Sequence, residues 1–169
     1  MKKIFLFFFA LTCVYAASGQ QKFGHINSGN LLEKLPEVAL ADSLLVKYQD
    51  SLALKGQELV KAFESSYTSY MDEVNKGLLP PVQQQQKEAT LQKQQEGIES
   101  YRDEMESKIA ARRQAYLKPI LGKVDEAIRK YGKENNYAFI FDTSTGATLF
   151  ALESDDLTNV ILAKITGMK

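Results

Sequence analysis

A helical pattern between residues 37 and 131, interrupted by one turn, constrains the fold of this chain more than any other feature. The turn is Gly77-Leu78-Leu79-Pro80-Pro81. Before it, apolar side chains recur at steps of three, four or seven residues, as in the seam between two packed helices: Leu45, Tyr48, Leu52, Leu59, Phe63, Tyr67, Tyr70 and Val74. The pattern predicts a long antiparallel helical hairpin, a coiled-coil arm over 37–131 with its tip at 77–82. Each leg of about 40 residues would extend roughly 60 Å, so this region forms an arm rather than an enclosed pocket.

The residues at the predicted helix ends agree with a hairpin. Gly77 suits the left-handed conformation that ends many helices, and Pro81 suits the first turn of the next helix. We expect a kink near 119, because Pro119 cannot donate the usual helical hydrogen bond. Beyond the kink, a denser apolar stripe should pack on a sheet: Ile120, Val124, Ile128 and Tyr131.

Residues 1–19 have the three-part pattern of a secretory signal peptide. Two lysines follow Met1, residues 4–14 are apolar, and small residues occupy 16–19. We therefore expect the mature chain to start near Gln20, with a cut after Ala16 as the alternative. Cys13 lacks the preceding small residue that a lipoprotein signal needs, so we do not expect a lipid anchor. The rest of the chain has no run of the roughly 20 apolar residues that a transmembrane helix requires. The sequence thus predicts an exported protein with no transmembrane segment.

Charge and cysteine content narrow the functional classes. The chain has 21 basic and 21 acidic residues, whereas nucleic-acid-binding proteins usually show a concentrated basic face, so we expect no nucleic acid partner. The only cysteine, Cys13, lies in the predicted leader. The mature chain therefore has no thiol for a disulfide, a nucleophile or a thiolate metal site. Its stability must come from packing and assembly.

Residues 20–36 and 132–169 predict a small β body. Their patterns indicate strands at 23–27, 137–141 and 148–152, a short helix with Ser28 as N-cap, and a final helix with Ser154 as N-cap. Three strands of about five residues lie at the lower margin of independent stability. We therefore expect subunits to share the body and cover one another's strand edges. The candidates for the oligomer core are Phe23, Ile26, Phe139, Phe141 and Leu149.

The order of these segments resembles a known family. The local resemblance is clearest in residues 22–32 (KFGHINSGNLL), 137–142 (YAFIFD) and 155–158 (DDLT). The arrangement is similar to that of the Skp (OmpH-like) periplasmic chaperones and covers essentially the whole mature chain. The resemblance implies an α+β fold in which a long helical hairpin projects from a small β body shared between subunits. It also implies homotrimers, a periplasmic location and ATP-independent holding of unfolded outer-membrane proteins.

One departure from the family concerns charge. Family members are often distinctly basic, whereas the mature chain expected here is slightly acidic, because loss of Lys2 and Lys3 with the leader leaves 19 basic against 21 acidic residues. Binding to lipopolysaccharide or acidic lipid through net charge is therefore put in doubt.

The two legs of the outer arm are poorly matched in apolar residues. The first leg is aromatic there, whereas the facing part of the second leg contains a glutamine run at 83–86. We hypothesise that unfolded clients contact Phe63, Tyr67, Tyr70 and Met71. The alternative is that these four side chains fill the hairpin seam. At the tip, Leu78, Leu79 and Val82 either touch client or membrane or, as we prefer, form a local hydrophobic staple.

No catalytic, cofactor or metal site is predicted. His25, the only histidine, lies in the first predicted strand, and no second histidine accompanies it to complete a zinc site. Asp142, Asp155 and Asp156 lie beside a turn and a helix start, which already explains them. No phosphate-cradling glycine loop is present. The leading interpretation is a holdase chaperone that is not an enzyme, and the alternative is an exported coiled-coil scaffold or adaptor of the cell envelope.

Overall fold

The computed structural model describes residues 21–167, so the predicted leader lies outside the described residues. The chain divides into two compact units. The helical hairpin comprises Pro36–Ile120, and the body comprises residues up to Leu35 together with those from Leu121 onward. The predicted class, a long helical hairpin with a small β body, is confirmed.

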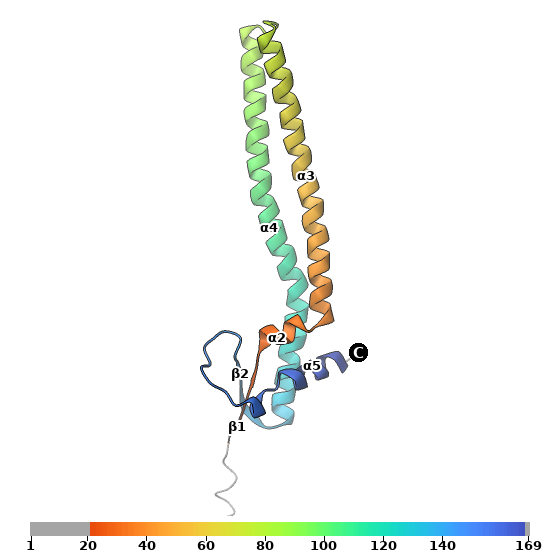
Figure 1. Ribbon diagram of the computed structural model, residues 1–169, viewed down its shortest axis with the longest axis vertical. Coiled ribbons are helices and arrows are strands. Elements are labelled where there is room, and N and C mark those ends of the chain that lie inside the picture. Colours follow the sequence, from red (N-terminus) through yellow and green to blue (C-terminus); the bar gives the residue numbers. More distant parts are fainter. Residues whose placement is uncertain (1–20, 168–169) are drawn as a thin grey trace, which may run out of the picture. The chain divides into compact units, whose positions relative to one another are not determined.

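Two long helices form the hairpin: α3 (Pro36–Asn75) and α4 (Pro81–Glu134). Figure 1 shows them side by side along the hairpin. At the end of α3, the N–H of Leu78 donates to the carbonyl of Glu73 and that of Gly77 to the carbonyl of Val74. This hydrogen-bond pair defines a Schellman motif, which requires a left-handed residue, and Gly77 has φ +66°. The predicted roles of Gly77 and of Pro81, the first residue of α4, are confirmed.

Leu78 and Val82 do not form the buried staple that we preferred at the tip. Their side chains are largely exposed. In a Schellman motif the residue after the left-handed glycine usually packs on the residue five positions earlier. That partner is Glu73, whose carboxylate is held by Lys87, so Leu78 has no apolar side chain to pack against at this position.

We expected the arm to run to Tyr131, whereas the residues from Leu121 to Glu134, about the last four turns of α4, group with the body. Helix α4 continues through Pro119 without a break, and the residues from Leu121 onward are assigned to the body. There Val124 and Ala127 are buried. The ring of Tyr131 lies 5.9 Å from that of Tyr137, and a Cβ at Gly132 would lie 3.3 Å from Ile140 Cδ1. The end of α4 thus packs on a strand, as the apolar residues between 120 and 131 predicted.

The body is built on a two-stranded parallel sheet. Strand β1 (Lys22–Ile26) pairs with β2 (Tyr137–Asp142), so that Phe23 lies beside Phe139 and His25 beside Phe141. Because side chains alternate between faces, Gly24 and Ile26 point into the core. A Cβ at Gly24 would lie 2.7 Å from Leu157 Cδ1 and 2.9 Å from Tyr137 Cε1. Glycine therefore permits this close packing.

Two short helices complete the core of the body: α2 (Ser28–Glu33) and α5 (Thr158–Gly167). The fully buried side chains are Leu31, Leu35 and Ile161. The cap of α2 is Asn27, whose side chain accepts from the N–H of Asn30 at 2.9 Å. The prediction that Ser28 caps this helix was therefore wrong by one residue.

The third predicted strand, 148–152, is not formed. The segment is irregular. The carbonyl of Leu152 accepts a hydrogen bond from the His25 imidazole rather than from the backbone N–H of a neighbouring strand. A short 3-10 helix, η2 (Glu153–Asp155), then turns the chain, and Asp156 alone makes a bridge with His25. Ser154 lies in η2 and does not cap α5. Asp156, two residues before the helix, instead accepts from the N–H of Thr158, the first residue of α5, at 2.8 Å.

Two carboxylates tie the ends of the body together. Asp142 accepts from the Ser28 hydroxyl at 2.6 Å and from the N–H of Ser144 at 2.9 Å. Asp156 accepts from Thr158, whose hydroxyl oxygen also receives the N–H of Asn27 at 2.9 Å. Burial opposes ionisation of both carboxyls, but the hydrogen bonds outweigh it and lower the pKa of each.

These carboxylates should make the body sensitive to acid. A carboxyl whose pKa is lower in the folded state stabilises the fold above its unfolded pKa, and this contribution disappears as pH falls through the folded value. We expect Asp142→Asn to lower the free energy of unfolding by about 1–3 kcal/mol at pH 7, and by much less near pH 2. Circular dichroism melts at both pH values measure the difference. Asp125→Asn, which removes an exposed pairing with Arg129, is the control and should change little. An equal loss at both pH values would contradict the assignment.

Candidate functional site

The four candidate client-contact residues of α3 do not share one environment. Tyr70 is only 9% exposed, and its hydroxyl donates to Glu88 Oε1 at 2.6 Å. Tyr67 and Met71 are 48% and 37% exposed. Phe63 is half-buried, and its ring stacks on that of Tyr67 at 6.1 Å. Tyr70 thus occupies the hairpin seam, whereas the other three lie on one side of α3.

One further residue belongs with those three. Val60 is 38% exposed and precedes Phe63, Tyr67 and Met71 by helical steps. The steps of three, four and four residues place the four side chains on one helix face. We call Val60, Phe63, Tyr67 and Met71 the apolar stripe. The seam pattern predicted from the sequence contains Leu59 and passes over Val60, although the same spacing rule relates Val60 to Phe63, Tyr67 and Met71.

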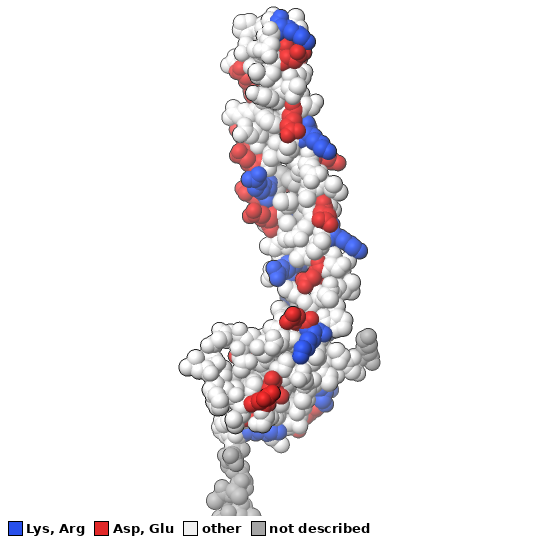
Figure 2. All heavy atoms as spheres, viewed as in Figure 1, with Lys and Arg blue, Asp and Glu red and all other residues white. Residues whose placement is uncertain are grey.

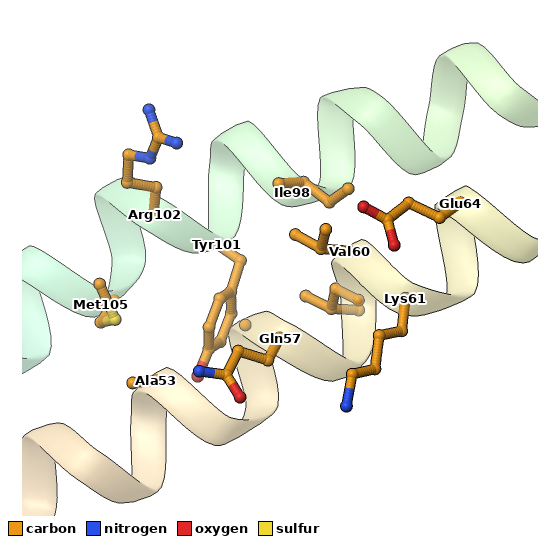
Figure 3. A pocket seen from close by; sticks show the side chains of 11 residues that line it. Ala53, Gln57, Val60, Lys61, Glu64, Ile98, Tyr101, Arg102 and Met105 are labelled. Carbon is orange, nitrogen blue, oxygen red and sulfur yellow. The ribbon is translucent and has the colours of Figure 1, made fainter.

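The apolar stripe begins at a groove between α3 and α4. The groove has a volume of about 500 Å³, and Figure 3 shows Tyr101 extending from α4 toward α3 inside it. The Tyr101 ring is 93% buried, and its hydroxyl donates to the carbonyl of Leu52 at 3.0 Å. Gly56 lies beside the ring: a Cβ added at this position would be 3.5 Å from it. The apolar lining of the groove includes Ala53, Val60, Ile98 and Met105. Three charged side chains also line the groove: Lys61, Glu64 and Arg102.

Beyond the groove, polar side chains connect the two helices. Lys87 Nζ lies 2.6 and 2.7 Å from the two carboxylate oxygens of Glu73, and Gln94 donates to Ser66 at 3.2 Å. The Lys87 ammonium lowers the pKa of Glu73, because its hydrogen bond favours the ionised carboxylate. The hydrogen bond to Glu88 raises the pKa of Tyr70, and burial acts in the same direction.

A second apolar surface lies on the open face of the sheet in the body. Phe23, Phe139 and Phe141 form an aromatic cluster with ring centroids 5.9 to 6.4 Å apart, and each ring is about half exposed. Leu149 is 98% exposed in the irregular segment that follows, and Phe150 is 81% exposed. We call these five residues the aromatic patch. Ile26, the remaining oligomer-core candidate, is instead buried in the core of its own body.

The polar candidates His25, Asp142 and Asp156 have hydrogen-bond partners within the body. The Nε2 atom of His25 lies 2.9 Å from the Leu152 carbonyl oxygen. Within residues 21–167, no group of three or more metal-ligating side chains comes together. No helix in this part of the chain is long and apolar enough to cross a membrane. Figure 2 shows acidic and basic side chains interspersed along the hairpin, without a large area of one sign on the visible face.

This architecture is found in a known protein family. The family model described as "Outer membrane protein (OmpH-like)" matches residues 22–165. The chain belongs to the OmpH-like family. Its structure is similar to a crystal structure of an OmpH-like protein from Caulobacter crescentus, described as a candidate outer membrane chaperone, with a TM-score of 0.75. The similarity covers 89% of this chain and 87% of that chain at 13% identity, so it concerns the fold. None of the curated proteins matches this OmpH-like chain.

The buried hydroxyl of Tyr101 should stabilise the hairpin of this OmpH-like protein. Tyr101→Phe leaves the carbonyl of Leu52 without this donor, so we expect the free energy of unfolding to fall by about 1 kcal/mol. Chemical denaturation followed by circular dichroism measures this loss. Tyr67→Phe is the matched control, because that side chain is half exposed. Equal stability of the two variants would show that the Tyr101 hydrogen bond does not contribute.

Proposed function

We propose that this protein is a periplasmic, ATP-independent holdase chaperone that binds unfolded outer-membrane proteins and prevents their aggregation. The observation that supports this most directly is the apolar stripe, which leaves aromatic and thioether side chains partly exposed on a helical hairpin. Membership of the OmpH-like family and the fold shared with the Caulobacter protein agree with the proposal. The leader pattern at residues 1–19 supports export.

The composition of the apolar stripe suits partners without a fixed shape. Met71 is flexible and polarisable, and Tyr67 combines an apolar ring with a polar end, so both adapt to different side chains. Charged residues of both signs are interspersed along the hairpin (Figure 2). Each contact is weak, and holding depends on many of them acting together. Such binding leaves the client much of its conformational entropy and needs no nucleotide.

We further propose that the aromatic patch is where subunits assemble, in the homotrimer that the family resemblance implies. A two-stranded sheet is marginal on its own, and its exposed phenylalanines would lose contact with water in an assembly. The strand edges and the irregular segment around Leu149 and Phe150 would be covered at the same time.

The alternative function, an envelope scaffold or adaptor, uses the same hairpin. A scaffold would bind one folded partner and would not suppress aggregation of an unfolded protein. The partly exposed apolar stripe favours the holdase, because an adaptor needs a surface complementary to a defined partner.

The holdase proposal predicts that light scattering will fall when an unfolded outer-membrane protein is diluted from denaturant into this protein without ATP. A triple variant should lose at least half of that protection, because it loses apolar contact area; its substitutions are Phe63→Ser, Tyr67→Ser and Met71→Ser. Tyr70 is left intact to preserve the seam. The matched control replaces three exposed apolar residues elsewhere on α3 by serine, Leu40, Val46 and Leu54.

Two outcomes would count against the proposal. Absence of protection by the assembled wild-type protein would favour the scaffold. Equal protection by the stripe variant and the wild type, with the fold intact by circular dichroism, would remove the stripe from the binding surface.

The assembly proposal predicts that Phe139→Ser with Phe141→Ser will shift the protein toward smaller species at low concentration. Two half-exposed rings lose their apolar contribution, so the dissociation constant should rise by at least tenfold. Sedimentation velocity over a concentration series measures the shift. Val160→Ser, a substitution of an exposed residue of α5, is the control. An unchanged oligomer in the double variant would exclude the aromatic patch as the interface.

A further inference from the structure

The seam of the hairpin changes character along its length. In α3 the buried residues are Ala41, Leu45 and Leu52, and then Tyr70 alone. In α4 no residue between 81 and 100 is buried, whereas Tyr101 is. The outer hairpin, residues 57–98, therefore has one buried side chain among its described residues, and that side chain ends in a hydroxyl.

Polar contacts replace apolar packing in this outer hairpin. Tyr70 is bound to Glu88, Lys87 to Glu73, and Gln94 to Ser66, each across the two helices. When the helices part, water can replace the hydrogen bonds, so the free energy lost is small compared with that of exposing an apolar core. The seam also contains a buried acceptor without a partner, Gln94 Oε1, which opposes closure.

The point where apolar packing stops is well defined. Tyr101 is anchored on the carbonyl of Leu52. The groove surrounds this contact and extends from it along α3 to Glu64. Gly56 and Gly97 lie at this level and are poor helix formers. The helices can therefore separate between Tyr101 and the turn of the hairpin while the inner seam stays packed.

We propose that the outer hairpin opens locally, with α3 and α4 parting beyond Tyr101, and that the Tyr70–Glu88 and Lys87–Glu73 contacts form the latch that keeps it closed. Opening exposes Tyr70 and the half-buried Leu91 and extends the apolar stripe to the inner sides of both helices. The enlarged surface accepts an apolar segment of an unfolded chain between the helices. This last step rests on the proposed holdase function, whereas the opening itself does not.

Hydrogen exchange of the protein alone tests the opening. Amides in 60–94 should exchange at least tenfold faster than those in 41–52 and 101–118, because helices that have parted lose the packing that stabilises them and then fray, which breaks their own backbone hydrogen bonds while the inner seam stays folded. Glu88→Gln and Tyr70→Phe should each raise exchange in 60–94 by a further threefold or more. Glu104→Gln is the matched control, since Glu104 pairs with Lys108 on the same helix and does not connect α3 to α4. Uniform exchange along the hairpin, or no response to the latch variants, would overturn the proposal.

A reversible covalent lock tests the role of opening in binding. Ser66→Cys with Gln94→Cys places one thiol on each helix at the level of the Gln94–Ser66 contact, in a chain that starts at Gln20 and has no other cysteine. A short bis-maleimide crosslinker with an internal disulfide joins the two thiols and is cleaved by reduction. The crosslinked protein should protect an unfolded outer-membrane protein at least threefold less than the same protein after reduction. Equal protection in the two states would show that client binding does not require the helices to part.

The two proposals fail in different ways. If the wild type shows fast outer exchange but protects no client, the holdase function is wrong and the opening remains. If the wild type protects clients but exchange is uniform along the hairpin, the latch is wrong and the holdase function remains.

Discussion

The parallel pairing of β1 with β2 is the constraint on which the rest of the fold depends. Parallel strands cannot be joined by a tight turn, and here the connection contains the whole helical hairpin. The pairing joins residues more than one hundred positions apart, so it must overcome a large loss of chain entropy. Asp142 and Thr158 supply contacts at the strand ends that help to do so. Because the segments before and after the hairpin meet in this sheet, the length of the hairpin can vary without changing the body.

Helix periodicity and helix-end chemistry predicted the hairpin because both depend on neighbours in the sequence. Gly77 and Pro81 have the roles that their backbone preferences dictate. The strand at 148–152 was predicted wrongly for the opposite reason, since a strand needs a partner edge that local sequence does not specify. Its apolar residues Leu149, Phe150 and Leu152 are exposed, with no strand edge beside them in the described part of this chain.

The candidate site was only partly predictable from sequence. Exposed aromatic residues on the outer α3 were identified, but their separate environments were not. Whether Tyr70 faces the seam or the solvent depends on which residue of α4 lies opposite, and a helical repeat does not fix the register between two helices. The structure places Glu88 opposite Tyr70, which turns an apparent contact residue into a seam residue.

The two apolar surfaces differ in ways that match different tasks. Three of the five residues of the aromatic patch are phenylalanines on the sheet, whose backbone holds them in place, and a rigid aromatic surface suits a partner of fixed shape. The apolar stripe contains tyrosine and methionine on a helix whose outer seam has little apolar packing. A surface that must accept many unfolded segments benefits from weak internal packing, because little stability is lost when its side chains rearrange. The same polar seam that makes the outer hairpin marginal as a coiled coil therefore suits it to variable contacts.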